Sequence, residues 1–282
     1  MDRCLPSGLK PKKSFGQNFL VDKKIVTDLV AAASLTKEDV VVEVGAGTGV
    51  LTKELAKRAG KVLAFEIDRD LIPVLKKNLQ EFDNIEIIGE DFLKVKNPVK
   101  SKNLLANARR TLHFSLRSKS ILLCSDILSS QFKLVGSIPY QITSPLIHKL
   151  LTLDPRPSLI VLLIQKEVAE KITAQPPKAT YLSNIIKLLG EVEIVRPVPK
   201  TAFWPVPAVD GAIIKLKVKG EKLKVDVEKF QKFLHRGFQH PRKMLRTKFD
   251  AVDLESCGIA PTRRAQTLGV DEWLKLYGEL LQ

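Results

Sequence analysis

Short apolar runs alternate with amphipathic stretches over the first two thirds of the chain. The apolar runs have the length of buried strands, and the stretches between them carry apolar residues at helical spacing. This alternation is typical of an α/β fold, a mostly parallel sheet covered by helices. The predicted strands are 40–44, 62–67, 85–89, 132–135 and 159–164, and the predicted helices are 22–34, 50–59, 69–80 and 144–153.

The pattern changes near Gly220. Before it, two β-rich runs at 192–195 and 212–218 flank a proline-rich loop at 197–207, which predicts a closing antiparallel pair. After it, helical patterns cover 226–238, 242–249 and 271–281. Asp22 and Ser144 are predicted N-caps, and Gly60 a C-terminal stop. We therefore expect one domain over 1–218 and a helical domain over 219–282.

Charge points to a polyanionic partner. The 282 residues include 46 Lys plus Arg against 31 Asp plus Glu, a formal net charge of +15. Basic residues concentrate at 97–133 and at 229–248. The second of these segments holds seven basic residues and no acidic residue. A solvated face can explain one such run, but two runs on a basic chain favour nucleic acid. The balance of 44% hydrophobic and 27% charged residues excludes a disordered or collagen-like chain.

The remaining composition predicts a cytoplasmic protein without a metal. The run 159–164 is far too short to cross a bilayer, and residues 1–18 lack the apolar centre of a signal peptide. We expect a monomer with ordinary thiols, because Cys4, Cys124 and Cys257 lack the paired spacing of a zinc site. His113, His148, His235 and His240 show no metal or triad spacing either.

A glycine-rich turn follows the first predicted strand and leads into a helix. Gly45, Gly47 and Gly49 permit close approach of a ligand to the backbone, and the helix that follows presents free N–H groups. A tight strand-to-helix turn would also favour glycine. The dinucleotide fingerprint requires a glycine where this chain has Val50, and no phosphate-binding lysine follows the loop. These departures disfavour a nicotinamide-dependent dehydrogenase.

Acidic residues follow the next two predicted strands in the order expected for an adenosine ligand. Glu66 and Ile67 end the second strand, where a carboxylate can accept hydrogen bonds from both ribose hydroxyls. Asp91 and Phe92 follow the third strand, placed for an adenine amino group and ring face. Either acid alone would be read as a helix cap or surface residue. Together with Gly45 and Gly47 they predict S-adenosylmethionine as the ligand.

A second motif ends the fourth predicted strand, where it reads Gly136-Ser-Ile-Pro-Tyr-Gln-Ile-Thr-Ser-Pro. Here the chain resembles the ribosomal RNA adenine N6-dimethyltransferases of the KsgA/RsmA type. The matching segments run in family order over most of the chain: Lys12-Lys-Ser-Phe-Gly-Gln-Asn-Phe-Leu, Glu43-Val-Gly-Ala-Gly-Thr-Gly, Phe65-Glu-Ile-Asp-Arg, Ser137-Ile-Pro-Tyr-Gln-Ile-Thr-Ser-Pro, Gln165-Lys-Glu-Val-Ala-Glu and Ala202-Phe-Trp-Pro-Val-Pro-Ala-Val-Asp.

The resemblance implies a Rossmann-like, class I S-adenosylmethionine-dependent methyltransferase. It implies dimethylation of N6 at two adjacent adenosines in the 3′-terminal hairpin of small-subunit ribosomal RNA, with an immature small subunit as partner. It places Gln17, Asn18 and Leu20 beside the cofactor with the residues named above. The side chain at position 137 and the backbone carbonyl near Pro139 would accept the N6 protons, and Tyr140 would stack on the base.

Two features depart from the family pattern. The family usually has asparagine where this chain has Ser137, and residues 97–131 form a basic insert relative to the usual spacing. Phe203 and Trp204 lie in the proline-rich loop, where Phe203 is a candidate to complete the adenine pocket, although core filling is the other reading. Two functional alternatives stay open: a large-subunit RNA methyltransferase of the antibiotic-resistance type, and a non-catalytic RNA-binding assembly factor.

Overall fold

The computed structural model describes residues 10–96, 132–220 and 225–280. The chain divides into two compact units, Met1–Lys166 with Val195–Val218, and Glu167–Ile194 with Lys219–Gln282. The predicted boundary after residue 218 coincides with one junction between the units. The segment 167–194, which the sequence analysis assigned to the first domain, groups instead with the C-terminal helices. The insert 97–131, with most of the first basic run, lies outside the described residues.

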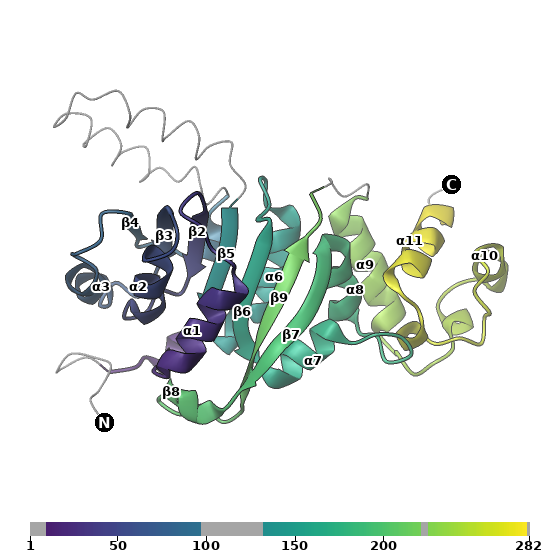
Figure 1. Ribbon diagram of the computed structural model, residues 1–282. Helices are drawn as coiled ribbons and strands as arrows, with labels where there is room; N and C mark the ends of the chain where they lie inside the picture. Colours follow the sequence, from purple (N-terminus) through teal and green to yellow (C-terminus); the bar gives the residue numbers. More distant parts are fainter. Residues whose placement is uncertain (1–9, 97–131, 221–224, 281–282) are drawn as a thin grey trace, which may run out of the picture. The chain divides into compact units, whose positions relative to one another are not determined.

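The main sheet in the described part of the chain has seven strands in the order β4-β3-β2-β5-β6-β9-β7 (Figure 1). Neighbours among the first five are parallel, and β9 is antiparallel to β6. Strand order reverses between β2 and β5, so the loops that leave their carboxyl ends diverge and open a crevice. The strands are β2 (Val40–Val44), β3 (Lys61–Phe65), β4 (Ile85–Ile88), β5 (Phe132–Ser137), β6 (Leu159–Gln165), β7 (Gly190–Val198) and β9 (Gly211–Val218).

Burial on both faces explains the continuous apolar runs of the central strands. Every side chain of β2 is buried, from Val40 to Val44. One face packs against α1 and α2 and the other lies toward α6 (Figure 1). On the face that α1 and α2 cover, Leu29 and Leu55 join Val41, Val135 and Leu163 in one apolar cluster. The helices of this unit are α1 (Lys23–Ala32), α2 (Val50–Ala56), α3 (Ile72–Asn78) and α6 (Thr143–Thr152).

The helix starts confirm one predicted cap and correct another. Asp22 caps α1, because its carboxylate accepts hydrogen bonds from the backbone N–H groups of Lys24 and Ile25 at 2.8 and 3.3 Å. Ser144 is not a cap. The 3-10 turn η4 (Tyr140–Ile142) runs directly into α6, so the chain is already helical when it reaches Ser144.

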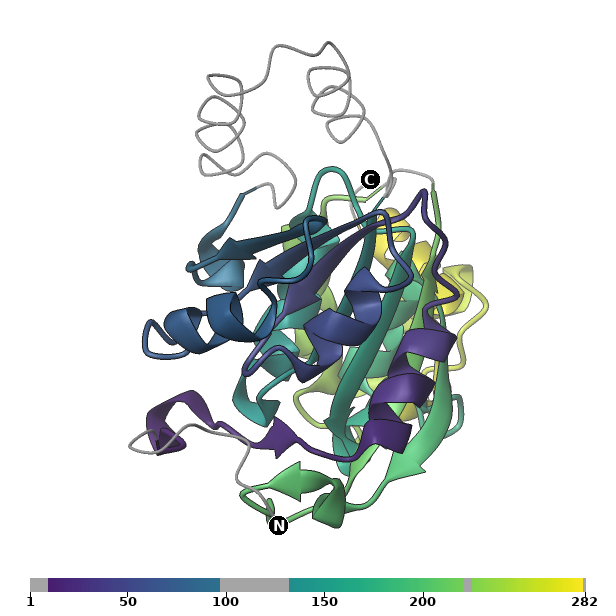
Figure 2. The same ribbon diagram turned by 60° about the vertical axis from the view of Figure 1, so that its left-hand side comes forward.

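A small two-stranded sheet holds the N-terminal segment against the proline-rich loop. Strand β1 (Phe19–Leu20) pairs antiparallel with β8 (Phe203–Trp204), and Figure 2 shows the two side by side, apart from the main sheet. Two 3-10 turns lie nearby, η1 (Lys13–Phe15) and η5 (Lys200–Ala202). The backbone N–H of Val21 donates to the carbonyl of Ala202 at 2.9 Å, which extends the pairing.

The second unit is mainly helical and also includes residues 190–194 of β7. It contains α8 (Tyr181–Leu189), α9 (Val227–Phe238), α10 (Ala251–Ser256), α11 (Val270–Glu279), most of α7 (Lys166–Thr173), and the 3-10 turns η6 (Leu245–Thr247) and η7 (Ala265–Thr267). Helices α9 and α11 approach closely at Gly237, where a Cβ atom would lie 2.4 Å from the Trp273 ring. The predicted helical stretch 242–249 contains only η6, and α7, α8 and α10 were not predicted. Among the described residues, no helix is long and apolar enough to cross a membrane.

Candidate active site

A cavity of about 190 Å³ opens in the first unit at the carboxyl ends of its parallel strands. This is where the reversal of strand order leaves a crevice. The structure brings together residues that lie up to 128 positions apart in the sequence, from Ser14 to Ile142. All the predicted cofactor residues line the cavity, and so do two predicted catalytic residues: Gln17, Asn18, Leu20, Gly45, Gly47, Glu66, Ile67, Asp91, Phe92, Ser137 and Pro139.

The glycine loop forms the wall of the cavity after β2. Gly45 and Gly47 have φ values of 77° and 59°, which non-glycine residues rarely adopt. A Cβ atom on Gly45 would lie 3.7 Å from the Ser137 carbonyl oxygen and 3.8 Å from Cδ of Pro139. The loop that follows β2 therefore lies close beside the loop that follows β5, and the two motifs border one space.

Glu66 is oriented by two backbone hydrogen bonds at the end of β3. Its Oε2 accepts from the N–H of Gly47 at 2.7 Å and its Oε1 from the N–H of Asp68 at 2.8 Å. Burial raises the pKa of Glu66, while these two hydrogen bonds oppose the rise. Each carboxylate oxygen can accept a further hydrogen bond, so the side chain remains able to bind a pair of neighbouring hydroxyls.

Asp91 and Phe92 form the wall after β4. Asp91 caps the turn η2 (Phe92–Lys94) by accepting from the N–H of Leu93 at 3.0 Å, and the same residue lines the cavity. The capping role and the site role are thus compatible. Phe92 is buried and packs edge-to-face on Phe65, with ring centroids 5.3 Å apart. Ile67 adds an apolar surface that is 46% exposed. An acceptor beside apolar faces is suited to an adenine ring.

Glu43 is a cavity residue to which the sequence analysis gave no role. Its side chain is fully buried in β2, and neither carboxylate oxygen makes a hydrogen bond within the described residues. Burial raises the pKa of Glu43 to about 8; the Thr52 hydroxyl opposes the rise and the Glu66 carboxylate adds to it. Glu43 is therefore protonated at neutral pH. The sequence showed a carboxylate within a buried strand but not that it borders the cavity.

Replacing Glu43 with glutamine is expected to remove a pH dependence of stability. In the unfolded chain this carboxyl loses its proton above its ordinary pKa of 4.5, whereas the folded protein retains the proton up to about pH 8. The unfolded state thus binds fewer protons in this range, and wild-type stability falls as pH rises. We expect the free energy of unfolding of E43Q, relative to that of wild type, to rise by about 2 kcal/mol from roughly pH 5.5 to pH 7.5. Denaturant unfolding of both cofactor-free proteins measures this, and parallel stability curves would contradict it.

The loop after β5 carries the second motif. Ser137 and Pro139 line the cavity, and the Pro139 carbonyl accepts from the N–H of Ile142 at 3.1 Å while keeping a second lone pair. Tyr140 is half-buried beside the cavity-lining residues of η4. Its hydroxyl is buried and has no hydrogen-bond partner in the described residues. Burial raises the pKa of Tyr140 to about 12, with a contribution from the Asp210 carboxylate.

Phe203 belongs to the core and not to the cavity. Its side chain is 4% exposed and joins the apolar cluster that includes Leu20, Val198 and Ile213. The register of β1 and β8 pairs Phe203 with Leu20. The structure thus places Phe203 in the core and not among the residues that line the cavity, and its role in covering a flipped adenine stays a prediction. Trp204, its neighbour, packs with Phe19 and Leu71.

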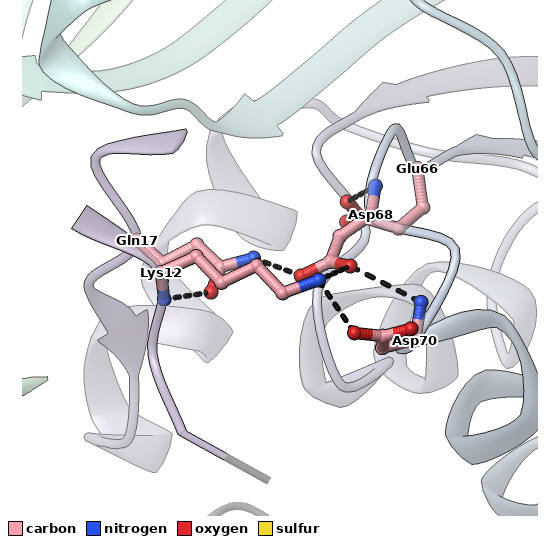
Figure 3. Close-up of polar contacts among 5 residues, drawn as sticks. All are labelled: Lys12, Gln17, Glu66, Asp68 and Asp70. Carbon is pink, nitrogen blue, oxygen red and sulfur yellow. Dashed lines mark hydrogen bonds and ion pairs between the residues drawn. The ribbon is translucent and has the colours of Figure 1, made fainter. Parts of the chain in front are cut away.

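A network of polar contacts ties the N-terminal segment to the residues after β3 (Figure 3). Gln17 donates from Nε2 to Oδ2 of Asp68 at 2.7 Å, and its Oε1 accepts from the N–H of Lys12 at 2.7 Å. The Lys12 ammonium lies 2.6 Å from both Asp68 and Asp70. Asn18 donates to the carbonyl of Gly16 at 3.2 Å. The segment that forms one cavity wall is thus held by side chains as well as by strand pairing.

Sequence comparisons assign the chain to a family. A family profile described as "Ribosomal RNA adenine dimethylase" matches residues 8–282. The chain belongs to the ribosomal RNA adenine dimethylase family. It is 38% identical over 279 residues to "Ribosomal RNA small subunit methyltransferase A" of Thermotoga maritima, covering 96% of this chain and 85% of that protein. The protein of the same name from Ligilactobacillus salivarius is also 38% identical, over 292 residues, covering 98% and 92% of the two chains.

Solved structures confirm the predicted fold class for this dimethylase. A dimethyladenosine transferase from Plasmodium falciparum matches with a TM-score of 0.75 and 25% identity over 93% of this chain and 97% of that one. The 23S rRNA methyltransferase ErmE matches with a TM-score of 0.68 and 28% identity over 94% and 100%. The dimethylase therefore has a class I methyltransferase fold with a C-terminal helical region.

Some expectations for the dimethylase stay predictions. Within the described residues, no group of three or more His, Cys, Asp or Glu side chains is placed to hold a metal ion. Cys257 is free and buried, while Cys4 and Cys124 lie outside the described residues. The monomeric state and the absence of a metal remain as the sequence analysis left them.

Proposed function

We propose that the protein transfers methyl groups from S-adenosylmethionine to N6 of two adjacent adenosines in the 3′-terminal hairpin of small-subunit ribosomal RNA. The carrying observation is that the glycine loop and the Ser137–Pro139 loop lie side by side and line one cavity, within a chain of the dimethylase family. The curated relatives from Thermotoga maritima and Ligilactobacillus salivarius, both named as small-subunit methyltransferases, support this substrate.

The residues of the cavity fit S-adenosylmethionine. Glu66 would bind the ribose hydroxyls, because both its oxygens are oriented by backbone donors and retain acceptor capacity. Asp91 and Phe92 would hold the adenine, and the loop from Gly45 to Gly47 would border the rest of the cofactor. Position 50 is valine, which leaves no dinucleotide fingerprint. When bound, the cofactor supplies an electrophilic methyl group on a sulfonium.

The loop after β5 would orient the adenine amine that receives the methyl group. That nitrogen donates its lone pair to the ring, so acceptors that bind its protons make it more nucleophilic. The hydroxyl of Ser137 and a backbone carbonyl near Pro139 are the proposed acceptors, and the ring of Tyr140 would stack on the extruded base. No strong base is assigned, because a sulfonium methyl requires mainly alignment.

The helical unit is proposed to bind RNA phosphates. Six of the seven basic side chains between Lys229 and Lys248 are exposed, while Phe230, Leu234 and Phe249 of the same region are buried. The basic residues thus lie on the solvent side of α9 and η6. Contacts of this kind position RNA without reading its sequence. A ribosomal substrate agrees with a cytoplasmic location.

Substitutions at position 137 test the proposed acceptor. Ser137→Ala is expected to lower kcat about tenfold, because it removes one hydrogen bond worth roughly 1 to 1.5 kcal/mol. Ser137→Asn, which restores the usual family residue, is expected to retain at least the wild-type kcat. Single-turnover methyl transfer with saturating cofactor measures both. A Ser137→Ala protein with wild-type kcat would show that the hydroxyl does not act on the amine.

The substrate is tested with labelled S-adenosylmethionine and immature small ribosomal subunits, followed by nucleoside analysis of the RNA. The expected product is N6,N6-dimethyladenosine in the terminal hairpin. A parallel reaction on immature large subunits tests the alternative suggested by ErmE, a 23S rRNA methyltransferase. Label in the large-subunit RNA alone would replace the proposed substrate. Cofactor binding without any product would favour the non-catalytic assembly factor.

A further inference from the structure

Residues 12–20 form one wall of the cavity although that segment has little regular structure. It contains the short turn η1 and the two-residue strand β1. It nevertheless supplies Ser14, Phe15, Gln17, Asn18 and the strand residues to the cavity. A segment with few backbone hydrogen bonds opens at a low free-energy cost unless other contacts hold it. Beyond the pairing of β1 with β8, side-chain contacts are therefore needed to hold it against the cavity.

Asp68 is the centre of those contacts (Figure 3). Its Oδ1 accepts from the Lys12 ammonium at 2.6 Å and from the N–H of Asp70 at 3.1 Å, and its Oδ2 accepts from Gln17 at 2.7 Å. Lys12 and Gln17 lie 56 and 51 residues before Asp68 in the chain. One carboxylate thus receives two side chains from the N-terminal segment.

The same residue supports the proposed ribose-binding carboxylate. The backbone N–H of Asp68 donates to Oε1 of Glu66 at 2.8 Å. The side chain of Asp68 thus contacts residues 12–20, while its backbone N–H orients Glu66. The turn after β3 links two sides of the cavity that are far apart in the sequence.

Burial and charge make this contact stronger than an ordinary surface ion pair. Asp68 is 2% exposed, and the Lys12 side chain is 36% exposed. Burial alone would raise the pKa of Asp68, but the hydrogen bonds from Lys12 and Gln17 outweigh it and hold that pKa below its usual value. The carboxylate is thus ionised at neutral pH, and charge-assisted hydrogen bonds to it are among the stronger ones in proteins.

We infer that Asp68 is a positioning residue for the methyl donor. Its side chain, with Lys12 and Gln17, holds residues 12–20 against the cavity, and its backbone N–H aligns Glu66. The inference rests on the proposed function, because it assumes S-adenosylmethionine in this cavity. If only a fraction of molecules has the segment closed, the apparent affinity for the cofactor falls by that fraction. Weakening the contacts of Asp68 with Lys12 and Gln17 should therefore mainly raise the rate of cofactor release and should change the rate of the chemical step much less.

The test compares three lysine variants in the full-length protein. Lys12→Met removes the ammonium, and Lys12→Arg keeps a cation able to contact both Asp68 and Asp70. Lys13→Met is the matched control, since Lys13 is an exposed neighbour of equal charge that does not line the cavity. The measurements are the dissociation rate of S-adenosylmethionine, its KM and kcat, and hydrogen exchange of the amides of residues 14–20 without cofactor.

Lys12→Met is expected to release the cofactor roughly tenfold faster, to raise KM for it similarly, and to change kcat less than about twofold. Its amides over 14–20 should exchange faster than in wild type. Lys12→Arg should restore both properties, and Lys13→Met should match wild type. Asp68→Asn, which alters the centre of the contacts, is expected to exceed Lys12→Met in the release rate.

Three outcomes would overturn the inference. Lys12→Met could release the cofactor at the wild-type rate, Lys13→Met could have the same effect as Lys12→Met, or kcat could fall as much as affinity. In each case wild type still binds S-adenosylmethionine, so the proposed function stands. A wild-type protein that binds no S-adenosylmethionine would overturn the proposed function and this inference with it.

Discussion

Tyr140→Ala is expected to lower kcat/KM for RNA methylation about 100-fold while leaving the affinity for S-adenosylmethionine within about threefold of wild type. Stacking of a base on an aromatic ring contributes roughly 1 to 3 kcal/mol, and a misplaced amine loses further rate. Tyr140 is half-buried with its hydroxyl inside the protein, so the ring is packed at its hydroxyl end. The measurement is methyl transfer at saturating cofactor, with binding followed by calorimetry.

Tyr140→Phe is the matched control. It keeps the ring and removes a hydroxyl that has no hydrogen-bond partner in the described residues. A phenyl ring should therefore support transfer at close to the wild-type rate, and the protein should be no less stable. Equal loss of cofactor affinity and transfer in Tyr140→Ala would indicate a folding defect instead of a lost stacking contact. A large loss in Tyr140→Phe would assign the hydroxyl, and not the ring, to the reaction.

Glu66→Gln is expected to weaken binding of S-adenosylmethionine roughly 10- to 100-fold. Hydrogen bonds to an ionised acceptor contribute roughly 1.5 to 3 kcal/mol, and an amide offers one acceptor oxygen where the carboxylate has two. In this protein both oxygens of Glu66 already accept a backbone N–H, from Gly47 and Asp68. The amide would also place an NH₂ group against one of those donors. Calorimetric titration with the cofactor measures the change directly.

The ribose role of Glu66 makes a further distinction possible. A ligand without ribose hydroxyls, such as the 2′,3′-dideoxy analogue of the cofactor, should bind wild type and Glu66→Gln with similar affinity. If the variant weakens both ligands equally, Glu66 acts by shaping the loop at Gly47 and not by binding the ribose. Glu81→Gln is a suitable control, because that exposed carboxylate pairs with Lys53 and does not line the cavity.

The local pattern of the sequence was sufficient to predict the central strands and the order of the cofactor residues. All five predicted strands occur, and β2 has the predicted bounds of 40–44. Parallel strands buried on both faces leave continuous apolar runs, and glycine and carboxylate positions at their ends follow from chain order alone. The cavity therefore contains the predicted Gly45, Glu66, Asp91 and Ser137.

Predictions were less reliable for residues whose place depends on contacts with a distant segment of the chain. Phe203 was a candidate for the adenine pocket with core filling as the other reading, because aromatic residues in a loop can serve either a site or a core, and composition does not separate these roles. Its partner Leu20 lies more than 180 residues away in the chain, and only the register of β1 and β8 decides which way the ring faces. For the same reason, the sequence did not show that 167–194 groups with the C-terminal helices.

By itself the sequence determined the fold class, the family resemblance and the predicted cofactor residues around the cavity, because each depends on short-range order along the chain. Tertiary structure alone decided that Lys12 and Gln17 contact Asp68, that Glu43 is fully buried beside the cavity, and that Phe203 packs in the core. These features arise from contacts between distant segments. Their energies depend on burial and on the direction of hydrogen bonds, and neither is encoded at a fixed sequence spacing.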